Sequence, residues 1–311
     1  MSIRPDSTAD ASVASIVAPD LFNGGSRGAA VVLGWCVLAA GALAPVAAGA
    51  PSGGPAAAAA PSSALPPTWT EPHTGMVFVL VPPGRFRMGS PDSEPRRETQ
   101  ETLHEVVISH AFYLGRDEVT QEEWRRVLGA NPSHFPDCGP RCPVESVSFL
   151  DAQRFVDRLI ELAPGERFRL PTEAEWEYAC RAGHDDAFGG AATLSAEQAN
   201  LDGRDPYPGA RSGPFRGRPT PVGTFPANAW GLRDVHGNVW EWTLDDHCPY
   251  PSGPLTDPRG RCTSGLKVIR GGSWYFGADS ARCALRYTHR PQDRGPSLGL
   301  RLVREIPLQE D

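Results

Sequence analysis

The sequence predicts an α+β fold: a single compact domain with little regular secondary structure. The chain of 311 residues contains 33 glycines and 32 prolines, many of which interrupt short apolar segments. Both residue types break helices and strands. Three segments nevertheless begin with helix-start signals, and short apolar runs resemble strands. We therefore expect many turns, short strands and three short helices.

The first 68 residues differ in composition from the rest. The stretch 29–50 is uncharged, follows Arg27 and ends in Ala48-Gly49-Ala50, which is typical of a secretory signal peptide. About 20 uncharged residues also suffice for a retained membrane anchor. We predict an export signal or anchor over 1–50, a disordered Pro/Ala-rich linker over 51–68 and a folded domain over 69–311. Both alternatives place the domain outside the cytoplasm, with the N-terminal segment as its only membrane contact.

Two segments near the start of the domain are expected to form strands. In "MVFVLVPPGRFRMGS", residues 76–90, apolar residues lead into a Pro-Pro-Gly turn, which predicts a strand pair. "HEVVISHAFYLGRDEVT", residues 104–120, is also strand-rich. Residues 184–304 are punctuated by glycine and proline, and we expect loops and small strands there.

Three helices are predicted from their start and stop signals. Each begins with a hydroxyl residue followed three positions later by an acidic one, which is a capping box or its aspartate variant. The pairs are Thr120 with Glu123, Ser148 with Asp151, and Thr172 with Glu175. The helices should end near Gly129, Pro164-Gly165 and Gly183. In the second helix one face is apolar, formed by Ala152, Phe155, Val156, Leu159 and Ile160.

Charge and cysteine content exclude some classes of partner and metal. The net charge is −7, and no cluster of basic residues is visible, so we expect no nucleic-acid binding. Beyond residue 68 there are six cysteines, and an even number in an exported domain favours disulfides. The residues alone do not choose among the 15 pairings that six cysteines allow, although Cys138 and Cys142 could close a local loop. Zinc is disfavoured, because CxxC pairs and nearby histidines are missing.

Eight ordered motifs resemble the formylglycine-generating enzyme family, also called the sulfatase-modifying factor family. They are VPPGRFRMGS, DEVTQEEW, NPSHF, CPVESVSFLDAQRF, RLPTEAEWEYACRAG, TPVGTFPANAWGLRDVHGNVWEW, VIRGGSW and LGLRLVR. The resemblance covers about 74–304 and implies a compact fold distantly like that of C-type lectins. It also implies an oxidase that converts a sulfatase cysteine to formylglycine, with copper(I) held by two thiolates. Soft thiolate ligands suit Cu(I).

The cysteines depart from the pattern of that family. Where the family has its first copper cysteine, this chain has Phe276, and the segment up to Cys283 contains no other cysteine. "RCALR" matches the family's structural cysteine, so the resemblance implies a disulfide from Cys283 to Cys180. The remaining cysteines would then pair as Cys138–Cys142 and Cys248–Cys262. Copper is therefore not expected.

The resemblance also implies calcium, which prefers mixed oxygen ligands. Asp234 and Glu241 would supply carboxylates, and Gly237 and Val239 would supply backbone carbonyls. Alternatively, Asp234 is a turn residue and Glu241 a surface charge. A second family site retains its Asn200-Leu201 pair, but Pro214 and Arg216 stand where an aspartate is needed. Calcium is thus expected first at the Asp234 site.

A candidate ligand pocket remains after the copper cysteines are lost. It comprises Ser273, Trp274, Trp240 and Arg286. The serine could bond a ligand backbone, the tryptophans could form apolar walls and the arginine could clamp a carboxylate. Each also has a purely structural interpretation: Trp240 as core and Arg286 as one half of an internal ion pair.

Three functions follow from these residues. The first is an exported family member without copper oxidase activity that acts in maturation or binds a peptide or small molecule. The second is an oxidase with different chemistry, like the members that mature pyoverdine in the periplasm. The third is a true formylglycine-generating oxidase, which the missing thiolates disfavour.

Overall fold

The computed structural model describes residues 65–306. The predicted export signal or anchor over 1–50 and most of the predicted linker lie outside these residues. Thr68, which was assigned to the linker, begins strand β1 (Thr68–Thr70), and β1 pairs with β2 (Val77–Val81). Among the described helices, none is long and apolar enough to cross a bilayer.

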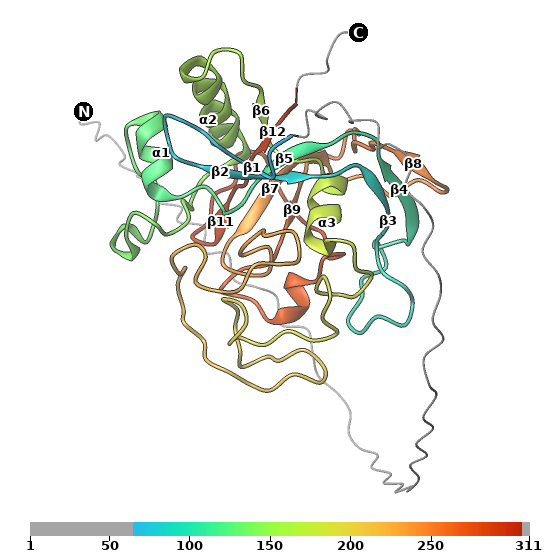
Figure 1. Ribbon diagram of the computed structural model, residues 1–311. Helices are drawn as coiled ribbons and strands as arrows, with labels where there is room; N and C mark the ends of the chain where they lie inside the picture. Colours follow the sequence, from blue (N-terminus) through green and yellow to red (C-terminus); the bar gives the residue numbers. More distant parts are fainter. Residues whose placement is uncertain (1–64, 307–311) are drawn as a thin grey trace, which may run out of the picture. The chain divides into compact units, whose positions relative to one another are not determined.

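The strands between residues 65 and 306 form three small sheets (Figure 1). The five-stranded sheet has the order β1-β2-β5-β12-β6, the four-stranded sheet β10-β9-β7-β11, and the three-stranded sheet β3-β4-β8. The remaining bounds are β3 Gly84–Met88, β4 His104–Ile108, β5 Phe112–Gly115, β6 Phe168–Arg169, β7 Trp240–Asp246, β8 Leu255–Thr256, β9 Lys267–Arg270, β10 Tyr287–His289, β11 Leu298–Gly299 and β12 Val303–Arg304. Strands from distant parts of the sequence therefore pair within each sheet.

The strand pair predicted over 76–90 is wrong in its pairing. Both strands exist, but β2 pairs with β5 and β1, whereas β3 pairs with β4 in another sheet. Pro82 and Pro83 lie between β2 and β3, and proline lacks the N–H that a ladder needs. These prolines thus lie in the connection between the two sheets.

All three predicted helices form, and each has its capping box. They are α1 (Gln121–Leu128), α2 (Phe149–Leu162) and α3 (Glu173–Arg181). In each helix the hydroxyl accepts from the backbone N–H three residues on, and the acidic side chain accepts from the cap N–H. The apolar face of α2 is buried as expected except at Ile160, whose side chain is exposed. Two short 3₁₀ turns, Pro136–Cys138 and Ala278–Ala281, complete the helical elements of the described chain.

Buried ion pairs connect these short elements. Five arginine side chains are among the largest fully buried groups, and each bonds a buried glutamate. The pairs are Arg181–Glu177, Arg270–Glu177, Arg282–Glu101, Arg286–Glu173 and Arg301–Glu241. Four of the five join segments that are far apart in sequence. Removing one partner of a buried ion pair strongly destabilises the fold, because the other charge is then left buried without a counter-ion.

The three disulfides expected from the resemblance are all present. They are Cys180–Cys283, Cys138–Cys142 and Cys248–Cys262. The first links α3 to the segment after the Gly-Gly-Ser-Trp turn. Cys283 is therefore a structural residue, as predicted.

Candidate functional site

The Gly-Gly-Ser-Trp segment forms a tight turn directly after β9. Gly271 and Gly272 have positive φ values of 99° and 73°, which favour glycine. A Cβ on Gly272 would lie 2.7 Å from Ser280 Oγ. Ser273 is fully buried, and its Oγ accepts a hydrogen bond from the backbone N–H of Tyr275 at 3.4 Å. The serine hydroxyl therefore stabilises the turn.

Aromatic side chains cover this turn and form what we call the aromatic patch. Its members are Trp240, Trp274, Tyr275, Phe276 and Tyr287. Trp240 stacks on Tyr287 with ring centroids 5.7 Å apart and meets Phe276 edge to face at 5.9 Å. Tyr275, Phe276 and Tyr287 are 57 %, 39 % and 51 % exposed. Large aromatic groups exposed together are typical of a binding surface.

Trp240 is a buried member of the aromatic patch. Its side chain is 3 % exposed and belongs to the main core, which agrees with the structural interpretation of this residue. Its Nε1 is buried without a hydrogen-bond partner among the described residues. An unpaired buried donor is unfavourable, so an acceptor that reached this N–H would gain a hydrogen bond.

Arg286 does not join the other three candidate residues. Its guanidinium pairs with Glu173 through Nε at 2.9 Å and through a terminal nitrogen at 2.8 Å, and it donates to the Cys248 carbonyl at 2.9 Å. Successive side chains of an extended segment point to opposite faces, which separates Arg286 from its neighbour Tyr287. Arg286 is thus the internal ion pair considered above, and it lines a different site.

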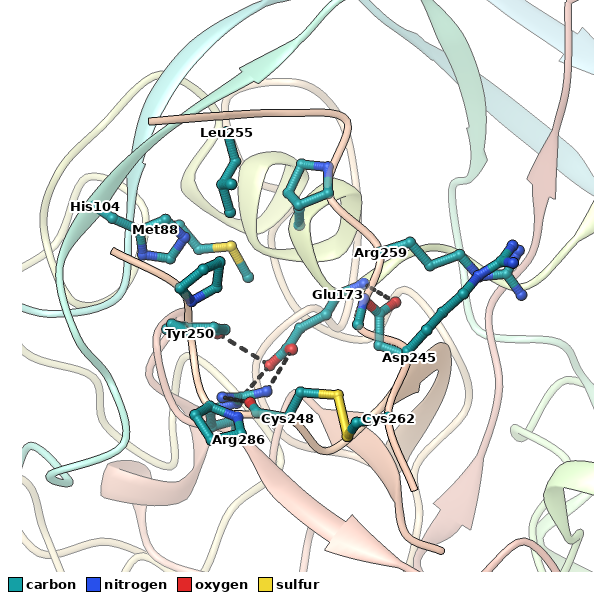
Figure 2. A pocket seen from close by; sticks show the side chains of 16 residues that line it. Met88, His104, Glu173, Asp245, Cys248, Tyr250, Leu255, Arg259, Cys262 and Arg286 are labelled. Carbon is teal, nitrogen blue, oxygen red and sulfur yellow. Dashed lines mark hydrogen bonds and ion pairs between the residues drawn. A yellow bond between two sulfur atoms is a disulfide. The ribbon is translucent and has the colours of Figure 1, made fainter. Parts of the chain in front are cut away.

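That site is a cavity of about 370 Å³, which we call the loop cavity. Figure 2 shows it between Tyr250, Leu255, Glu173 and Arg286. Its walls come from the ends of β3 and β7, the first residues of β4 and α3, and the segment between the disulfide-bonded Cys248 and Cys262. β8 fixes this segment by pairing in parallel with β4. Its lining residues are Met88, His104, Glu173, Ala174, Asp245, Cys248, Pro249, Tyr250, Pro251, Leu255, Pro258, Arg259, Gly260, Arg261, Cys262 and Arg286.

Buried acidic groups form the floor of the loop cavity. Asp245 accepts from the backbone N–H groups of Glu173 and Gly260, at 2.8 and 2.6 Å. Burial, with the nearby charge of Glu173, raises the pKa of Asp245 to about 7. Tyr250 donates its hydroxyl to Glu173 at 3.1 Å, and burial raises the pKa of Tyr250 well above its usual value. Sequence analysis does not identify this group, because its members come from the start of α3, the end of β7 and the loop after Cys248.

The residues expected to bind calcium are buried, but Glu241 already has cationic and polar partners. Its carboxylate accepts from Arg301 through two guanidinium nitrogens and from Trp176 Nε1 at 2.7 Å. It is fully buried, so its interpretation as a surface charge is wrong. The Arg301 guanidinium thus occupies the charge position that a cation would take beside Glu241. This carboxylate fits calcium poorly unless Arg301 moves.

Asp234 has a different environment. It has a positive φ of 52°, and its carboxylate accepts from the Gly223 N–H at 2.6 Å. Burial raises the pKa of Asp234 to about 6. Gly237 and Val239 follow within the same buried segment, and Glu118 accepts from the Val239 N–H at 2.9 Å. Asp234 is therefore the stronger of the two carboxylates as a calcium ligand, and this site stays a prediction.

At the second predicted calcium site, one residue offers a suitable oxygen ligand and another does not. Asn200 and Leu201 are buried, and Asn200 Oδ1 has no hydrogen-bond partner among the described residues. Arg216 donates to the Ala196 carbonyl at 2.8 Å instead of supplying a carboxylate. The side-chain oxygen of Asn200 could coordinate a cation, but Pro214 and Arg216 supply no carboxylate where the family pattern needs one.

The cysteines leave no thiolate for copper in residues 65–306. All six of the cysteines there are in disulfides. Within this range the one group of close ligand atoms is Cys180, His236 and Cys283. His236 Nδ1 lies 2.8 Å from the Ala281 carbonyl, and both sulfurs are bonded to each other. This arrangement offers no soft two-thiolate site.

The fold and the motifs define the class of this protein. Residues 63–306 match the family described as the Sulfatase-modifying factor enzyme 1-like domain. The chain therefore belongs to this family, as its motifs predicted.

Three similar proteins illustrate the range of the family. The chain is 30 % identical over 287 residues to hercynine oxygenase of Mycolicibacterium smegmatis, covering 76 % of this chain and 63 % of the relative. It is 29 % identical over 283 residues to the formylglycine-generating enzyme of Bos taurus, covering 72 % and 73 %. The structure of PvdO from Pseudomonas aeruginosa has a TM-score of 0.66 at 29 % identity, covering 78 % and 100 %. The chain thus spans about three fifths of the hercynine oxygenase length.

Proposed function

We propose that this protein is an extracytoplasmic member of the family that binds a peptide or small-molecule ligand, or assists maturation, without copper oxidase chemistry. The observation that carries the proposal is the replacement of the copper cysteine position by Phe276, which packs on Trp240 at 5.9 Å. An aromatic ring binds ligands by packing and cannot hold Cu(I). The three disulfides support an oxidising compartment.

The aromatic patch is the proposed ligand surface. The exposed rings of Phe276 and Tyr287 pack on the buried Trp240, whose N–H has no partner among the described residues, and the exposed Tyr275 packs on Phe276. An extended peptide offers apolar side chains to such rings and a carbonyl to the indole N–H. Peptide is therefore the favoured ligand class at this surface.

Two measurements on the purified full chain test the chemistry. We expect no stoichiometric copper in metal analysis and no conversion of a CxPxR peptide supplied with Cu(I). Stoichiometric copper with turnover would refute the proposal and support a formylglycine-generating oxidase.

A second candidate is an oxidase with different chemistry, which the similarity to an oxygenase and to PvdO favours. Co-purification of another redox metal at one ion per chain would support it. Such a result would replace the first proposal.

Binding at the aromatic patch needs a separate test. Peptides selected from a random display library on the full chain should lose at least about tenfold in affinity for Phe276→Ala and Tyr287→Ala. Leu150→Ala serves as the control, because this exposed leucine lies in α2, outside the patch. Equal affinity for the patch and control variants would show that the patch is not the ligand surface.

A further inference from the structure

The loop cavity is independent of the aromatic patch and contains none of its residues. Its volume of about 370 Å³ falls in the range of small-molecule sites. The segment that covers it is closed by Cys248–Cys262 and held against β4, where Asp257 N–H donates to the Val107 carbonyl at 2.9 Å. The segment that covers the cavity is therefore held in place by covalent and hydrogen-bonded contacts.

Charges around the cavity are not balanced. The Glu173 carboxylate is paired with Arg286 and accepts from Tyr250. Arg259 and Arg261 line the cavity and are exposed, and within residues 65–306 neither forms an ion pair, although Arg259 lies near enough to Asp245 to lower the pKa of its carboxyl. Guanidinium groups bind carboxylates in a planar, two-bond geometry. The cavity rim therefore favours an anionic group.

His104 provides a hydrogen-bond acceptor in the wall of the cavity. Its Nδ1 lies 2.9 Å from the Thr102 carbonyl, which can only accept, so Nδ1 carries the proton. In the tautomer with its proton on Nδ1, Nε2 is an acceptor, and it is buried with no partner among the described residues. The side chain is only 8 % exposed. A buried acceptor without a donor is unfavourable, and a ligand hydroxyl or N–H would satisfy it.

Between these polar groups the walls are mostly apolar. Met88, Leu255, Pro249, Pro251 and Pro258 line the cavity together with Tyr250, whose ring lies against His104 with the centroids 4.7 Å apart. Thioether and ring surfaces pack well against an aromatic ring. Figure 2 shows His104 and Arg259 on opposite sides of the cavity, with Met88 and Glu173 between them.

We propose that the loop cavity binds a small aromatic carboxylate that carries a hydroxyl or N–H at the end opposite its acid. The ring lies between Met88, Leu255 and the prolines. The carboxylate meets Arg259 and Arg261, and the opposite donor bonds His104 Nε2. Because the cavity and the aromatic patch share no residue, this site works whether or not the proposed peptide function holds.

Calorimetric titration of the full chain tests the assignment with 4-hydroxyphenylacetate as the probe. We expect saturable binding, weaker by at least about tenfold for 4-hydroxyphenylacetamide, which lacks the charge. Phenylacetate, which lacks the hydroxyl, should also bind more weakly. Equal affinity for the acid and the amide, or no saturation in the millimolar range, would overturn the proposal.

Variants locate the binding. Arg259→Ala with Arg261→Ala should reduce the affinity for the acid to that for the amide. The control pair, Arg125→Ala with Arg290→Ala, removes the same charge from exposed positions outside the cavity and should keep the affinity within about twofold. Equal losses in both pairs would show that only the net charge matters and would refute the site.

The hydroxyl contact has its own test. His104→Phe should abolish the difference in affinity between 4-hydroxyphenylacetate and phenylacetate, while wild type retains it. A difference that persists in a folded His104→Phe variant would contradict the role of His104. Should that variant not fold, a lack of difference between the two probes in wild type would contradict it equally.

Discussion

Removal of the Cys180–Cys283 disulfide tests how this fold is stabilised. We consider the double variant Cys180→Ala with Cys283→Ala. The two cysteines are separated by 103 residues in sequence, and a crosslink over such a loop lowers the entropy of the unfolded chain by the equivalent of about 4.7 kcal/mol. Both side chains are fully buried, so lost packing adds to this value. The expected loss is therefore a large share of the stability of a typical domain.

The other two disulfides close shorter loops, so their removal should cost less stability. Cys248 and Cys262 are separated by 14 residues and Cys138 and Cys142 by 4, which corresponds to about 3 and about 2 kcal/mol in the same treatment. Urea unfolding followed by tryptophan fluorescence should therefore rank the three double-alanine variants by loop length. The reasoning is refuted if the Cys180–Cys283 variant is the least affected, or if it unfolds at the wild-type urea concentration.

Three further predictions concern charge. Arg301→Met leaves Glu241 buried without its ion pair and should lower the free energy of unfolding by about 3–5 kcal/mol. Arg87→Met, which breaks a half-exposed pair, should cost less than about 1 kcal/mol in the same urea titration. The pKa of Asp245 is raised in the folded state to about 7. Between pH about 4 and about 7 the carboxyl is ionised in the unfolded chain and protonated in the folded one, so the free energy of unfolding falls as the pH rises. The stability advantage of wild type over Asp245→Asn should shrink across that window, and an advantage that stays constant would contradict the raised pKa of Asp245. Finally, calcium added to the chelator-treated chain should raise its melting temperature, and an unchanged value would remove calcium from the proposed cofactors.

Local signals in the sequence predicted the structure well. The three capping boxes placed the helices, because a cap depends on residues only three apart. The family motifs placed the Cys180–Cys283 pair. These features depend on short spacings or on a recognised pattern, which can be read along the chain.

Long-range pairing could not be predicted in the same way. β2 and β3 are neighbours in sequence but belong to different sheets, since β2 pairs with β1 and β5 whereas β3 pairs with β4. The motif predicts Arg286 beside Ser273, but its guanidinium bonds Glu173 on another side of the segment. Nothing in "HEVVISH" indicates that His104 faces a cavity closed by a segment about 150 residues away. Such sites arise only when the sheets assemble.

The buried arginine–glutamate pairs have an evolutionary consequence. Neither member of a pair such as Arg282–Glu101 can change alone without leaving a charge stranded in the interior. We therefore expect substitutions to be tolerated less at these paired residues than in the exposed segments that they support. The segment between Cys248 and Cys262 is fixed at both ends by a crosslink while its exposed residues contribute little to folding. The exposed residues that this segment contributes to the loop cavity can thus change more freely than Glu173 and Arg286, which line the same cavity but belong to the ionic framework.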